Sequence, residues 1–214
     1  TSGNRSTSNC DKRCRLLALC YAVRLERIYS SLDEKLKRHH KRGPIAVLVD
    51  ALASLKPDPI RWARLSVDGS LPARGDFTRA DWKTFSGLLR QLIVRAQNLG
   101  ARWHVPVESR SKARAYRAAL KDLGVVVRRS DQSKTVERVL ESSDCRSWVA
   151  CAGELHNGHV SKAQNAKNTD YAFEVARQCR QAGVSSVVCP AVYGSGMCGN
   201  CTACASDLVE LVIY

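Results

Sequence analysis

The stretch that decides the fold is Leu99 to Val127, which runs LGARWHVPVESRSKARAYRAALKDLGVVV. Residues 102–108 alternate apolar and polar side chains, which predicts a strand. Residues 111–123 have helical spacing and end at Gly124, where glycine favours a helix stop. Residues 125–127 predict a short, fully buried strand. A strand, a helix and a strand with glycine stops between them are typical of a parallel α/β fold.

The same alternation extends in both directions along the chain. We expect further strands at 60–67, 147–152, 185–189 and 208–214, and helices at 23–40, 44–55, 78–98, 135–140 and 170–182. Thr78 and Asp81 predict a capping box at the start of one helix. The fold class is therefore α/β with a mostly parallel sheet, interpreted as an incomplete (β/α) barrel. We divide it into an N-terminal cysteine loop (1–22), an α/β domain (23–182) and a C-terminal strand and cysteine segment of that domain (183–214).

Chemistry in parallel α/β folds lies at the carboxyl ends of the strands. Five loops are predicted at that edge of the sheet: 68–72, 108–111, 130–133, 153–159 and 189–204. No apolar run approaches the length of a membrane span, so no membrane partner is expected.

The most specific motif lies near the C-terminus. The chain has ten cysteines, and four of them have the spacing C-P-x7-C-x2-C-x2-C: Cys189, Cys198, Cys201 and Cys204. Three cysteines at two-residue gaps with a remote Cys-Pro are typical of [4Fe–4S] ligation. Structural zinc prefers two separated pairs and remains the alternative, followed by disulfides.

A second cysteine group lies near the N-terminus. Cys10, Cys14 and Cys20 have the spacing C-x3-C-x5-C. Three thiolates can hold a [4Fe–4S] cluster with one iron open to a ligand, as an open zinc position does in catalysis. The alternatives are a zinc site completed by a histidine, or cysteines that are merely buried. The candidate histidines are His39, His40, His104, His156 and His159. Cys145, Cys151 and Cys179 fit no motif, and we expect Cys151 and Cys179 in the core.

The charge distribution suggests a polyanionic partner. The net charge is +14, and no Lys or Arg follows Gly183. The first 42 residues hold eleven Lys and Arg against four Asp and Glu. Such an asymmetry favours nucleic acid as a partner, with a solvated basic face as the alternative. The candidate phosphate contacts are Lys12, Arg13, Arg15, Lys37, Arg38, Lys41 and Arg42.

The loop at 153–159 carries acid–base candidates. Glu154, His156 and His159 follow a predicted strand, where they form a possible acid–base or metal element. A solvated polar loop is the favoured interpretation.

The residues also resemble a known family. Cys20-Tyr21-Ala22, the segment Ser66-Val67-Asp68-Gly69, and Val187 to Ala191 with Cys198 to Ala205 look like the phage and plasmid "gene product 88"-type proteins. The resemblance covers most of the chain in order, and its last segment is the specific one. That family in turn looks distantly like radical S-adenosylmethionine proteins.

The resemblance implies a location and a chemistry. It places the chain in the cytoplasm of a bacterial host. It implies that Cys10, Cys14 and Cys20 hold a catalytic cluster that binds S-adenosylmethionine, and that Asp68 lies where the cofactor's amino group is bound. The C-terminal cysteines would then hold an auxiliary cluster. The cysteine spacing departs from the usual C-x3-C-x2-C, and no clear Gly-Gly-Glu follows the next strand.

Two hypotheses follow from the sequence. The first is an iron–sulfur protein with radical S-adenosylmethionine-like architecture, in which Asp68, Glu154 and His156 are the catalytic candidates. The second is a basic nucleic-acid-binding protein whose metal sites, zinc or iron–sulfur, are structural.

Overall fold

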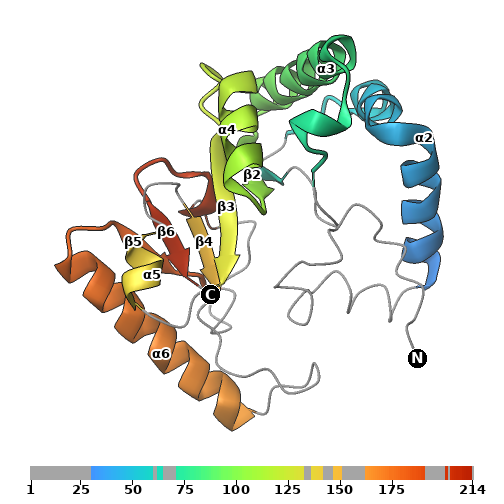
Figure 1. Ribbon diagram of the computed structural model, residues 1–214. Helices are drawn as coiled ribbons and strands as arrows, with labels where there is room; N and C mark the ends of the chain where they lie inside the picture. Colours follow the sequence, from blue (N-terminus) through green and yellow to red (C-terminus); the bar gives the residue numbers. More distant parts are fainter. Residues whose placement is uncertain are drawn as a thin grey trace.

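The computed structural model describes residues 30–59, 62–64, 71–132, 136–141, 147–150, 162–190, 201 and 203–213. Its centre is a six-stranded sheet in which each pair of neighbouring strands is parallel (Figure 1). The order across the sheet is β1-β2-β3-β4-β6-β5. The strands are β1 (Trp62–Arg64), β2 (Arg102–Val107), β3 (Val126–Gln132), β4 (Ser147–Ala150), β5 (Ser186–Val188) and β6 (Leu211–Ile213).

Helices alternate with these strands, so the predicted parallel α/β class is confirmed. They are α2 (Ser30–Ser54), α3 (Arg79–Asn98), α4 (Arg110–Ala119), α5 (Val136–Leu140) and α6 (Lys162–Gln181), with the 3-10 helices η2 (Arg74–Asp76) and η5 (Ala203–Ala205). In the described part of the chain, none of these helices is both long and apolar enough to cross a bilayer.

Local chemistry explains where these helices begin and end. The Thr78 hydroxyl accepts a hydrogen bond from the Asp81 amide at 3.1 Å, which confirms the predicted cap of α3. Ser109 caps α4 in the same way, through the Lys112 amide at 3.2 Å. Helix α4 ends at Ala119, and the turn that leads from it to β3 contains Gly124 with φ +62°, a left-handed conformation that glycine adopts without strain.

Two elements differ from the sequence-based expectation. The loop predicted at 130–133 is wrong for residues 130–132, because β3 continues to Gln132 and pairs there with β4. The arginines and polar residues that follow Val127 conceal this extension. Helix α6 begins at Lys162, before the predicted 170. The break expected between the helices at 23–40 and 44–55 is confirmed, because α2 consists of two helices that meet at a kink where Gly43 has a non-helical backbone with φ +77°.

Two apolar clusters stabilise the helix-covered side of the sheet. One joins α2, α3 and α4 to β2 and β3, and its core includes Phe85, Leu89 and Val105. Trp103 lies in this cluster with 7% of its surface exposed. The other cluster joins α5 and α6 to β5 and β6. Cys179 of α6 is fully buried in it, as predicted.

The pleat of β2 and β3 defines a second face. Trp103 and Val105 of β2 and Val127 of β3 pack beneath the helices. Because successive side chains on a strand point to opposite faces, His104 and Arg128 lie on the other face of the sheet. Both side chains are nevertheless buried, at 1% and 0% exposure. That second face is therefore covered as well.

The chain order identifies what covers this face. From β1 to β5 the chain moves toward one end of the sheet, whereas the step from β5 to β6 goes back, because β6 lies between β4 and β5. Parallel crossovers are right-handed, so a step in the reverse direction places its connection on the opposite face from α3 to α6. Residues 189–210 form this connection, and its η5 packs against β2 and β3.

Candidate functional site

The connection between β5 and β6 carries the C-terminal cysteines and spans the sheet from edge to edge. It leaves β5 at the carboxyl edge, where the Cys189 amide donates to the Ile213 carbonyl at 2.7 Å. It enters β6 at the amino edge, where the Ser185 amide donates to Glu210 Oε2 at 2.8 Å. Its described parts are residues 189–190, 201 and 203–210.

Arg128 of β3 holds the last part of this connection. Its guanidinium donates hydrogen bonds to five backbone carbonyls of residues 203–210. Nε donates to Cys204 at 2.7 Å and Nη1 to Glu210 at 3.3 Å. Nη2 donates to Ala203 at 3.0 Å, Ser206 at 2.7 Å and Val209 at 2.8 Å.

In this arrangement the buried charge of Arg128 and the backbone carbonyls of residues 203–210 satisfy each other. A guanidinium remains charged at any accessible pH, and a buried charge costs several kcal/mol unless polar groups surround it. Residues 203–210 contain only a single 3-10 turn, so most of their carbonyls have no ladder partner. Arg128 supplies donors for these carbonyls, and they surround its charge with oxygen atoms. The segment is thereby fixed to the sheet without regular secondary structure.

The described cysteines occupy different parts of the connection. Cys201 has a free thiol and is half-buried. Cys204 lies in η5, half-buried, with its carbonyl on Arg128. Cys189 lies at the opposite edge of the sheet, beyond β5. Cys198 is outside the described residues. Within the described residues, no group of three or more His, Cys, Asp or Glu side chains is close enough to hold a metal ion.

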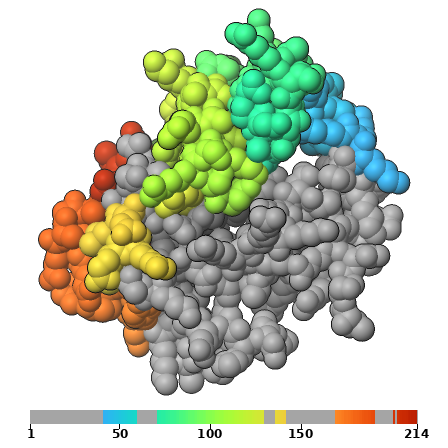
Figure 2. Space-filling model, viewed as in Figure 1, coloured from blue at the N-terminus to red at the C-terminus, as the bar shows by residue number. Residues whose placement is uncertain are grey.

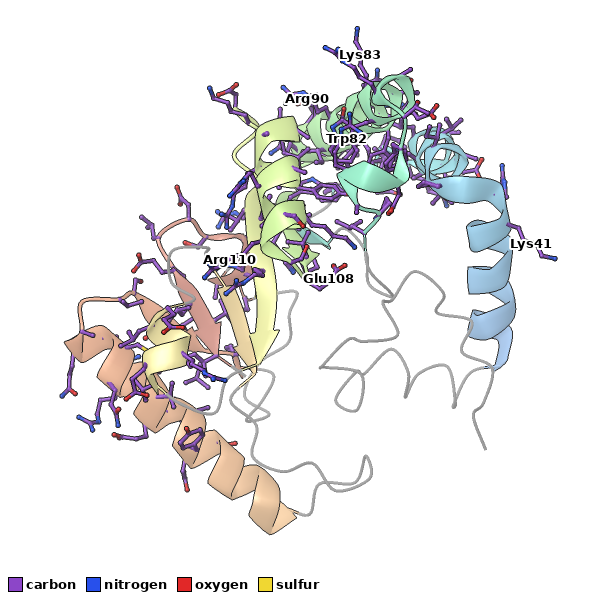
Figure 3. The ribbon with its side chains drawn as sticks, viewed as in Figure 1. Lys41, Trp82, Lys83, Arg90, Glu108 and Arg110 are labelled. Atoms are coloured by element: carbon purple, nitrogen blue, oxygen red, sulfur yellow. The ribbon has the colours of Figure 1, made fainter. Side chains whose placement is uncertain are left out.

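Most of the other predicted site residues lie outside the described part of the chain. These are Asp68, Glu154, His156, His159, Cys10, Cys14, Cys20, Lys12, Arg13 and Arg15. Lys37 and Arg38 lie in α2, of which the described side chains begin at Lys41. Lys41 is exposed and points away from the sheet (Figure 3). Arg42 forms an ion pair with Asp50 of the same helix, so part of its charge is neutralised.

A polar cluster fixes the carboxyl edge near β1 and β2. Lys112 of α4 pairs with Glu108, which directly follows β2, and donates to the Leu71 carbonyl at 2.5 Å. The Tyr116 hydroxyl donates to the Pro72 carbonyl at 2.9 Å. The chain just beyond Asp68 is therefore anchored to α4.

Tyr116 is the most strongly perturbed acid in this cluster. Burial raises the pKa of its phenol well above the ordinary value, and the carboxylates of Glu108 and Asp76 raise this pKa further. The phenol is therefore a hydrogen-bond donor throughout the physiological pH range.

No family model, curated protein or solved structure matches the chain. The residue that sequence reasoning missed is Arg128, because an arginine after three valines gives no sign of being buried. The available signal is the alternation of side chains along a strand: if residues 126–132 form a strand, Arg128 lies on the opposite face of the sheet from Val127.

Proposed function

We propose that this chain is an iron–sulfur protein whose C-terminal cysteine segment binds the cluster. The observation that supports the proposal is the set of five hydrogen bonds from the buried Arg128 to residues 203–210. These bonds fix the backbone of the segment that carries Cys204, three residues after Cys201. Thiolate ligands at such short gaps are typical of iron–sulfur loops.

The charge of Arg128 favours a negatively charged ligand set. Cysteine ligands bind iron as thiolates, so several negative charges gather where they meet. A permanent cation behind the backbone of Cys204 lowers the electrostatic cost of gathering them. The carbonyl bonds also order the segment before any metal arrives, which lowers the entropic cost of binding.

Three of the four proposed ligands are Cys198, Cys201 and Cys204, and the role of Cys189 is a separate question. The structure holds Cys189 at the carboxyl edge and Cys204 on Arg128, toward the amino edge. We therefore propose the bunched cysteines as the primary ligands and Cys189 as the candidate fourth. Removing each thiol in turn distinguishes a three-cysteine site from a four-cysteine site.

The deciding measurement is the iron, acid-labile sulfide and zinc content of anaerobically purified protein. About four iron and four sulfide per chain are expected for one cubane cluster. Cys201→Ser and Cys204→Ser should each lose most of the iron and sulfide. Cys179→Ala is the matched control, since this thiol is buried in the apolar cluster of α6, and its iron content should not change. Zinc without sulfide would contradict the proposal and make the site structural.

The finer hypothesis concerns the N-terminus and rests on the family resemblance. It places an open cluster on Cys10, Cys14 and Cys20 and S-adenosylmethionine on its free iron, with Asp68 near the cofactor and the sheet as part of an incomplete barrel. The cluster would supply reductive cleavage of the cofactor. About eight iron per chain, with cofactor cleavage that Cys14→Ala abolishes, would support it. Cleavage that survives this substitution would exclude the N-terminal site.

A further inference from the structure

The two ends of the connection between β5 and β6 lie at opposite corners of the sheet. Cys189 directly follows β5, which is the last strand at one edge. Cys204 lies in η5, which packs against β2 and β3 near the other edge. Figure 1 shows the segment before β6, in red, at the end of the sheet where the strands begin, whereas Cys189 lies where β5 ends. These positions decide whether both thiols can bind one cluster.

The strand register gives the distance between these positions. One line of paired residues crosses β3, β4, β6 and β5: Arg129, Ser147, Leu211 and Ser186. Neighbouring strands are about 4.8 Å apart, so β3 and β5 are separated by about 14 Å. Arg128 lies just before this line and Cys189 lies beyond it, which adds about 13 Å along the strands. The backbones of Arg128 and Cys189 are therefore roughly 18–20 Å apart.

Arg128 fixes the position of Cys204 at the far end of this distance. Its Nε donates to the Cys204 carbonyl at 2.7 Å, and η5 packs against β2 and β3 rather than toward β5. Two cysteine side chains with a cluster between them span at most roughly 13 Å from one α-carbon to the other, because each side chain and each metal–sulfur bond contributes only about 2–3 Å. Cys189 is therefore too far from Cys204 to bind the same cluster.

No described side chain takes the place of Cys189. Within the residues that the structure describes, no His, Asp, Glu or further Cys joins Cys201 and Cys204 in a group of three that could hold a metal ion. Both thiols are half-buried, so they are partly open to solvent. Figure 2 shows atoms of the C-terminal segment, in red, at the molecular surface. A small molecule can therefore reach the coordination position that Cys189 does not fill.

We propose that the cluster at Cys198, Cys201 and Cys204 has three cysteine ligands and one iron that binds an exchangeable small molecule. This inference rests on the proposed iron–sulfur function. A metal with an open position keeps a water molecule there and exchanges it for a ligand, as catalytic zinc does. Imidazole nitrogen and carboxylate oxygen both bind iron in proteins. The ligand is therefore a small molecule with a nitrogen or oxygen donor.

The first test is mild oxidation of the anaerobically purified protein with ferricyanide. An iron without a cysteine thiolate is the one that oxidation releases. The [4Fe–4S]2+ cluster gives one electron to ferricyanide, loses one Fe2+ and becomes [3Fe–4S]+. The iron content should therefore fall from about four to about three per chain, while the sulfide content stays at about four. The [3Fe–4S]+ product is detected by electron paramagnetic resonance, and ferrous iron added with a reductant should remove its signal.

The variant Cys189→Ala separates the two assignments. It should contain about four iron per chain and lose one on oxidation, as the unmodified protein does. If Cys189 is a ligand, the unmodified protein will keep all of its iron and Cys189→Ala will not, which would overturn the proposal. Cys179→Ala is the matched control, because this thiol is buried in the apolar cluster of α6. It should behave as the unmodified protein does.

The second test is the binding of imidazole to the reduced cluster, followed by electron paramagnetic resonance. The spectrum should shift in the unmodified protein and in Cys189→Ala alike. A spectrum that imidazole leaves unchanged in both proteins would overturn the exchangeable site. Zinc without sulfide before oxidation would overturn the iron–sulfur function itself. Iron that survives oxidation at about four per chain would overturn only the open position.

Discussion

The two faces of the sheet are stabilised by opposite means. On the helix-covered face, the rings of Phe85, Trp82 and Tyr116 pack in tilted and edge-to-face arrangements with centroids 5.6–6.4 Å apart, and Leu89 is fully buried in the same cluster. On the other face, a single buried cation binds five carbonyls of a segment with little secondary structure. The first face gains stability from area removed from water, and the second depends on the position of individual hydrogen bonds. The difference shows where a sequence can change and where it cannot.

The second face should respond most to a single substitution. Arg128→Met keeps an apolar chain of similar length but leaves up to five carbonyls without their donor. Because each unsatisfied buried group costs about 1–3 kcal/mol, we expect a loss of about 3–5 kcal/mol in the free energy of unfolding, measured by urea titration. Amide exchange should also increase at residues 203–210 before the rest of the sheet opens.

A matched substitution separates the loss of charge from the loss of contacts. Arg177→Met removes a cation from the exposed surface of α6 and should leave the free energy of unfolding nearly unchanged. Equal effects of the two substitutions would show that residues 203–210 are not held by Arg128, and the comparison between the two faces would fail.

The helix-covered face should lose stability in proportion to buried volume. Leu89→Ala removes a side chain with 0% exposure and should cost about 2–5 kcal/mol, with protection lost across α3 and β2 together. Leu208→Ala is the control, because Leu208 is 81% exposed, and its effect should be close to zero. A local rather than cooperative loss after Leu89→Ala would mean that this face does not unfold as one unit.

The same contrast explains how much the sequence predicted. Apolar periodicity and glycine stops identified the strands and the order of elements, because the helix-covered core depends on pattern rather than on particular partners. The cap at Thr78 and the buried place of Cys179 followed for the same reason. The partners of Arg128 could not be predicted, since they are backbone carbonyls about 75 to 82 residues later in the chain, and carbonyls carry no sequence signature.

Tyr116 joins both kinds of stabilisation and gives the smallest predicted effect. Tyr116→Phe keeps the ring in the apolar cluster and removes the hydrogen bond to the Pro72 carbonyl. At pH 8 we expect a loss of about 0.5–1.5 kcal/mol in the free energy of unfolding.

The pH dependence of this variant has a definite sign. Burial raises the pKa of Tyr116 in the folded state above the unfolded value of about 10, so the folded form resists ionisation. The stabilising contribution is present below about pH 10 and is lost as the pH rises above it, because only the unfolded chain then ionises. Phenylalanine has no such loss. Urea titrations at about pH 8 and pH 11 should therefore show that the difference in the free energy of unfolding between the unmodified protein and Tyr116→Phe shrinks or reverses at the higher pH. Lysines titrate in both proteins, so their contribution cancels in this difference. A difference that stays constant would mean that Tyr116 ionises as easily in the folded chain as in the unfolded one, and that its hydroxyl is not held inside the apolar face.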